Sequence, residues 1–169
     1  MDRHNSRAGG PPHGGRGKRE EALEGHKGVS DEIIENLGNP QASVDLVSKI
    51  INSPREFEIK SESSYRKIHD IFSSVLDSTL NMINSGTLKT QIDQVYLNLA
   101  KVRVIIEYQS ARGQISHNIA KVLNGAIDML KKQLDNIKGS NQPDLQGLRK
   151  LIENIRVVID SFAVLAKKG

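Results

Sequence analysis

Lysine and arginine are the side chains in this sequence whose type and spacing best suit binding chemistry. Residues 101–132 hold six of them and two acids. Ammonium and guanidinium groups bind phosphate oxygens, and arginine does so with two parallel hydrogen bonds. The chain has no tryptophan, three tyrosines and three phenylalanines, most at core spacing. We therefore expect contacts to the sugar–phosphate backbone of RNA, with little sequence specificity and strong salt dependence.

Three residues of this block, Lys101, Arg103 and Arg112, are the leading phosphate donors, and Lys121 continues the block. The alternative is that these side chains only hydrate a helix surface or pair locally. Asp128 and Lys132 stand four residues apart and are expected to form such a local pair. Charge alone leaves both interpretations open.

No residues of the sequence form a recognisable catalytic group. The chain has five histidines and no cysteine, which excludes disulfides and thiolate sites. Only His69 and His117 lie outside the N-terminal segment, and neither has metal-ligand spacing. Nucleotide-binding and hydrolase motifs are also missing. We expect a non-enzymatic protein without a cofactor, metal or small-molecule substrate.

Two regions of different composition divide the chain. Residues 1–28 are rich in Arg, Gly and Pro and are expected to be a disordered arm, either gripping phosphates or only aiding solubility. Residues 29–169 are expected to form one helical domain. The first 19 residues have no apolar stretch, and no apolar run approaches the length needed to cross a bilayer. We therefore expect a soluble, cytoplasmic protein without membrane contact.

From residue 29 onward the apolar residues repeat with a helical period. The pattern predicts short helices around 30–37 and 41–52, and longer ones over 61–85, from 87 onward, and over 144–167. Pro54, Gly86 and the Gly139–Pro143 segment are expected breaks, and Gly113 with Ser116 would kink or split the fourth helix. This pattern predicts an all-α fold, a compact bundle of five to six helices behind the N-terminal arm.

The helix predicted from residue 87 to 112 is apolar on much of its circumference. Its core stripe centres near Leu99 and Ile106. A second stripe, roughly 140° away on a wheel of about 100° per residue, is shared by Gln94, Lys101, Tyr108 and Arg112. The apolar residues Leu97, Val104 and Ile105 flank that second stripe. Such a helix is either central in its bundle or in contact with a second molecule.

Two elements in this helix resemble the small helical subunit of type III-A CRISPR effector complexes. They are Lys89-Thr90-Gln91-Ile92-Asp93 and Val102-Arg103-Val104-Ile105-Ile106-Glu107-Tyr108-Gln109-Ser110-Ala111-Arg112. The resemblance covers residues 88–134. It implies a non-catalytic subunit that repeats along an RNA-guided antiviral defence complex, lines the guide and target RNA, and packs against copies of itself and other effector subunits.

The resemblance also implies RNA contacts for Tyr108 and Arg112, with Arg103 at a usually basic position. Asp93 stands where the family commonly has arginine, which puts that contact in doubt. Lys89, one turn earlier, would supply the missing charge or be neutralised by Asp93.

Charge is unevenly distributed along the folded region. Residues 20–54 hold seven acids and two lysines, so this segment and the basic block are candidate complementary surfaces between repeated copies. The competing hypotheses are a helical protein–protein adaptor that uses Leu97, Val104 and Tyr108 without binding RNA, or a small subunit of another CRISPR effector class.

Overall fold

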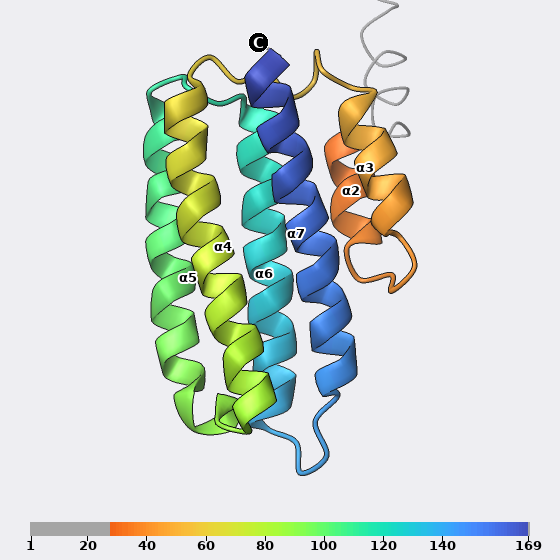
Figure 1. The fold of residues 1–169 in the computed structure, drawn as a ribbon, viewed down its shortest axis with the longest axis vertical. Coiled ribbons are helices and arrows are strands. Elements are labelled where there is room, and N and C mark those ends of the chain that lie inside the picture. Colours follow the sequence, from red (N-terminus) through yellow and green to blue (C-terminus); the bar gives the residue numbers. More distant parts are fainter. Residues whose placement is uncertain (1–27, 169) are drawn as a thin grey trace, which may run out of the picture.

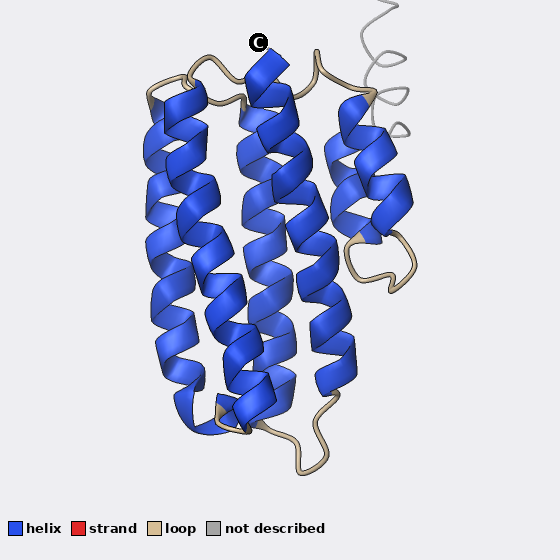
Figure 2. Cartoon of the chain, viewed as in Figure 1, coloured by secondary structure: helices blue, strands red, loops and turns tan. Residues whose placement is uncertain are grey.

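The computed structural model describes residues 28–168 and confirms an all-α bundle. Six helices make up this part of the chain (Figures 1 and 2). They are α2 (Val29–Asn36), α3 (Ser43–Ile51), α4 (Glu62–Ser85), α5 (Leu88–Ala111), α6 (His117–Lys138) and α7 (Leu145–Lys168). The predicted arm of residues 1–28 lies outside the described residues, apart from Gly28. None of the described helices is long and apolar enough to cross a lipid bilayer.

The helices pair into three layers. The outer layer of α4 and α5 packs on α6 and α7, because α4 contacts α7 and α5 contacts α6. The short helices α2 and α3 cover the other side, with α2 on α6 and α3 on α7. The four long helices run alternately up and down (Figure 1). The middle layer of α6 and α7 therefore lies between two helix pairs, and its side chains dominate the core.

Helix breaks fall where the sequence predicts them. The Ser61 hydroxyl accepts a hydrogen bond from the Ser64 amide and caps α4, and Gly86 ends this helix at a φ of 73°. Gly113 has a φ of 71°, and the Ser116 hydroxyl caps α6. Because left-handed backbone favours glycine and serine oxygens satisfy free amides, these residues separate α5 from α6.

Helix α5 is not the central helix of the bundle. It contacts α4 and α6 and no other described helix, and it forms one edge in Figure 1. Leu97, Val104 and Tyr108 are 50%, 67% and 58% exposed. Of the two interpretations open from the sequence, the middle-helix one is wrong for this chain, and the apolar outer side of α5 is free for contact with a second molecule.

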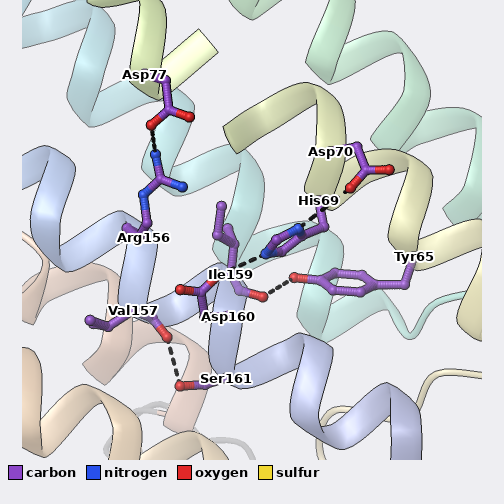
Figure 3. Close-up of polar contacts among 9 residues, drawn as sticks. All are labelled: Tyr65, His69, Asp70, Asp77, Arg156, Val157, Ile159, Asp160 and Ser161. Atoms are coloured by element: carbon purple, nitrogen blue, oxygen red, sulfur yellow. Dashed lines mark hydrogen bonds and ion pairs between the residues drawn. The ribbon is translucent and has the colours of Figure 1, made fainter. Parts of the chain in front are cut away.

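Polar contacts join α4 to α7 along one seam (Figure 3). The buried Tyr65 hydroxyl donates to the Ile159 carbonyl at 2.5 Å, and His69 Nε2 lies 2.7 Å from Asp160 Oδ1. Further along α4, Arg156 of α7 pairs with Asp77. Burial, and secondarily the Asp160 charge, raise the pKa of Tyr65 well above its usual value of 10. The seam fixes α4 against the middle layer.

Asn154 attaches the α2–α3 pair to α7. Its side-chain amide nitrogen donates to the carbonyls of Leu37 and Asn39 at 2.9 and 2.7 Å, and its oxygen accepts from the Ser43 hydroxyl at 2.6 Å. Asn154 is 1% exposed, so these bonds satisfy a polar group that water does not reach. The turn between α2 and α3 is thereby held on the core.

Candidate nucleic-acid interface

The outer sides of α4 and α5 form one surface, which we call the α4–α5 face. Helical spacing aligns its members on each helix, and the two helices pack side by side. Its members are Lys67, Ile71, Ser74, Ser78, Leu97, Lys101, Val104, Tyr108 and Arg112. None of these side chains is acidic, and α4 contributes mainly small uncharged ones.

Three cations of the α4–α5 face have no acidic partner among the described residues. The side chains of Lys67 and Lys101 are exposed and form no hydrogen bond or ion pair with residues 28–168. The Arg112 guanidinium lies 5.3 Å from the centre of the Tyr108 ring, a cation–π distance. Such a contact holds the arginine on the surface while its N–H donors stay free for phosphate.

Four of the five carboxylates of α4 and α5 are engaged by other side chains, and the fifth, Asp70, is exposed and lies 3.8 Å from Nδ1 of the neighbouring His69. Asp77 pairs with Arg156 of α7, and Asp93 lies 3.3 Å from the Lys138 ammonium of α6. The Glu107 carboxylate accepts from the Asn124 amide of α6 at 2.7 Å. Asp77 and Asp93 are thus paired with cations of neighbouring helices, Glu107 is held toward α6 by a neutral amide, and the members of the α4–α5 face keep a net positive charge.

A shallow groove runs between the two helices of this face. It has a volume of about 240 Å³ and is lined by Ile71, Ser74, Val75, Ser78, Asn98 and Lys101. Serine hydroxyls and an asparagine amide donate hydrogen bonds to anionic oxygens, and a lysine adds charge. The lining contains no carboxylate that would repel a phosphate, so it suits a phosphate backbone.

The other predicted RNA-binding residues are engaged elsewhere. Arg103 pairs with Asp128 of α6, so Asp128 does not serve the local pair expected with Lys132. Lys121 pairs with Asp31 of α2 at 2.9 Å. Both cations lie between helices, where their ion pairs link α5 to α6 and α6 to α2.

Lys89 and Asp93 do not neutralise one another. The Lys89 ammonium donates to the Ser140 carbonyl at 2.7 Å, whereas Asp93 pairs with Lys138. Lys89 lies in the first turn of α5, far along the helix from Arg112 at its end. The structure therefore brings together Lys101, Tyr108 and Arg112, and leaves Lys89, Arg103 and Lys121 outside the α4–α5 face.

Lys67 is a member of the face that sequence reasoning missed. The sequence signal for it is that Lys67 lies at helical spacing from a row of uncharged residues on α4, namely Ile71, Ser74 and Ser78. Without knowing which helix lies beside α5, that row has no neighbour and predicts only an exposed surface. The packing of α4 on α5 makes Lys67 part of the same surface as Arg112.

Other sites for chemistry are few in the part of the chain that the structure describes. No group of three His, Asp or Glu side chains there could hold a metal ion. Desolvation, and secondarily a hydrogen bond to Asp135, raise the pKa of Tyr96 to about 12. His69 and Tyr65 border a hollow of about 360 Å³ between α4 and α7, where their polar atoms bond to α7.

No known family model matches this chain, and neither a curated protein nor a solved structure matches it.

Proposed function

We propose that this protein is a non-catalytic small subunit of a type III-A CRISPR RNA-guided effector complex. In this proposal the α4–α5 face contacts the sugar–phosphate backbone of the guide and target RNA. The apolar side chains Leu97 and Val104 then pack against a neighbouring effector subunit or a second copy. The resemblance of residues 88–134 to that family names the complex, and the surface of α5 supports the RNA contact.

One observation carries the proposal. The face has three cations without an acidic partner among residues 28–168, Lys67, Lys101 and Arg112, whereas Asp77, Asp93 and Glu107 of the same helices contact side chains of α6 and α7. Since uncompensated charge on a surface attracts polyanions, a surface with three unpaired cations beside exposed apolar residues suits a subunit that contacts both RNA and protein.

A second function is favoured by the apolar residues alone. Leu97 and Val104 are one-half and two-thirds exposed on the same side of α5, and exposed apolar groups on one helix side are typical of protein contacts. A helical adaptor would use this side and bind no RNA. A small subunit of another CRISPR class would share the RNA contact and differ in its partners.

RNA binding in a range of salt separates these functions. We would measure anisotropy of labelled single-stranded RNA with the full chain between about 50 and 200 mM salt. The test variant is Lys67→Gln/Lys101→Gln, and the matched control is Lys131→Gln/Lys132→Gln on α6, which removes the same charge from another surface. Two lost phosphate contacts lower the salt slope by about 1.4 and affinity by roughly tenfold.

Each outcome has one meaning. A loss in the test variant and not in the control supports RNA binding by the α4–α5 face. Equal losses in both variants would show that only net charge matters and would remove the face from the proposal. If no form binds RNA while Val104→Asp abolishes co-purification of a protein partner, the adaptor replaces the RNA-lining subunit. Co-purification with the other effector subunits tests membership of the complex.

A further inference from the structure

Helices α3 and α7 end, and α4 begins, at the same end of the bundle (Figure 1), and the chain segments there carry four exposed cations. Arg55 and Lys60 lie in the loop between α3 and α4, and Lys167 and Lys168 are the last residues of α7. We call these four residues the basic end. None of them forms an ion pair with another residue that the structure describes.

The loop that carries two of these cations is fixed. The Ser116 amide donates to the Glu58 carbonyl at 2.9 Å, and the Lys60 amide donates to the Gln114 carbonyl at the same distance. Phe57, in the same loop, is buried with its ring 5.0 Å from that of Phe162 of α7. The cations are thus placed by a packed backbone, and binding does not have to order a free loop.

Acids near the basic end are mostly engaged. The Glu62 carboxylate pairs with Arg66 at 2.7 Å, and the Glu56 carboxylate accepts from the Asn118 amide at 3.2 Å. Glu58 is the remaining carboxylate of the loop. Because the Asn118 amide is neutral, Glu56 keeps its charge, and two carboxylates, Glu56 and Glu58, against four cations leave this end positive.

The basic end continues the α4–α5 face. Arg112 follows the last turn of α5, eleven residues and about 16 Å beyond Lys101 along the helix axis. Beyond it lies a hollow of about 420 Å³, lined by Glu58, Lys60, Ser110, Gly113, Ile115, Ser116 and His117. The Lys60 amide bonds to the Gln114 carbonyl, two residues after Arg112, so the loop of the basic end lies next to the end of α5 that carries Arg112.

We infer that the basic end is a second contact for the phosphate backbone, on which an RNA strand leaving the α4–α5 face continues past Arg112. This inference rests on the proposed function. The basic end and the α4–α5 face then bind one strand.

The experiment uses the full chain and labelled oligouridylate of about 30 nucleotides, with affinity measured from about 50 to 200 mM salt. The end variants are Arg55→Gln/Lys60→Gln and Lys167→Gln/Lys168→Gln, each removing two charges. Lys131→Gln/Lys132→Gln is the matched control. We expect each end variant to lower the salt slope by about 1.4 and affinity at about 150 mM salt roughly tenfold, and the control to change neither.

The face variant Lys67→Gln/Lys101→Gln separates failure of this inference from failure of the proposed function. If the face variant weakens binding and both end variants match the control, the basic end is not a contact, and the proposed function stands. If wild type itself does not bind RNA at low salt, both fall. If the end variants weaken binding and the face variant does not, RNA binds the end alone, and the continuous path is wrong.

Discussion

Replacing Asn154 tests whether one buried amide holds the α2–α3 pair on the bundle. In Asn154→Ala the carbonyls of Leu37 and Asn39 lose their donor, and the Ser43 hydroxyl loses its acceptor. At about 1 kcal/mol net for each lost hydrogen bond, the cost is about 3 kcal/mol. A domain of this kind is stable by about 5 to 15 kcal/mol, so the change is large.

Equilibrium unfolding in urea, followed by helical circular dichroism, measures this cost. Asn154→Asp keeps the shape of the side chain and removes its two N–H donors, so it should cost at least as much as the alanine variant. Asn98→Ala is the control, because its oxygen accepts only from Gln94 on the helix surface, at 3.1 Å. We expect the control to lose less than about 0.5 kcal/mol.

The substitution is also expected to destabilise one part of the bundle first. Because α2 and α3 contact the rest of the bundle on one side only, hydrogen exchange in Asn154→Ala should accelerate in these helices before α4 and α5. A free-energy loss below about 1 kcal/mol, or exchange that rises equally in all helices, would refute the role we assign to this side chain.

Three further substitutions or conditions test the packing. A Cβ on Gly125 would lie 2.8 Å from the Cγ1 and Cδ1 atoms of Ile34, so Gly125→Ala should cost about 1–2 kcal/mol of unfolding free energy, and less in combination with Ile34→Ala. Gly86→Ala should cost about 1 kcal/mol by thermal or urea unfolding, because its φ is 73°. Because the pKa of Tyr65 is raised when folded, its stabilisation is full below pH 10 and falls above it by about 1.4 kcal/mol per pH unit. Tyr65→Phe should flatten this alkaline decline, leaving the smaller contribution of Tyr96, whose pKa is raised to about 12.

The sequence predicted the helices well because each boundary has a local cause. Apolar residues repeat every three to four positions, and Pro54, Gly86 and Gly113 interrupt the repeat. These signals act within one or two turns of the chain, so they can be recognised without the fold. The isolated β-bridge pairs Ile59 with Ile115, which is distant in the sequence. The alternation of apolar and polar residues over 57–59 is too short to predict such a pairing.

The candidate site was only partly predictable, because ion pairs between helices depend on which helices meet. Arg103 and Lys121 are, like Lys101, basic residues in a predicted helix. In the structure, however, they pair with Asp128 and Asp31 of other helices. Helical spacing placed Lys101, Tyr108 and Arg112 together, since that depends on α5 alone. Lys67 joins them only through the packing of α4 on α5.

The outer side of α5 can be tested without knowing its partner. Leu97 and Val104 are about 50% and 67% exposed, so their substitution should hardly change the stability of the isolated chain. We expect Leu97→Gln/Val104→Gln to cost less than about 0.5 kcal/mol in urea unfolding.

Leu99→Ala provides the contrast. Leu99 is fully buried on the opposite side of the same helix, and this substitution should cost about 2–5 kcal/mol. If the glutamine variant is also strongly destabilised, the two apolar residues serve the fold, and the case for a contact surface fails. If the glutamine variant is stable and loses partner binding, Leu97 and Val104 form a contact surface. The partner that covers them would then lie beside Lys101 and Arg112, where the RNA strand is proposed to run.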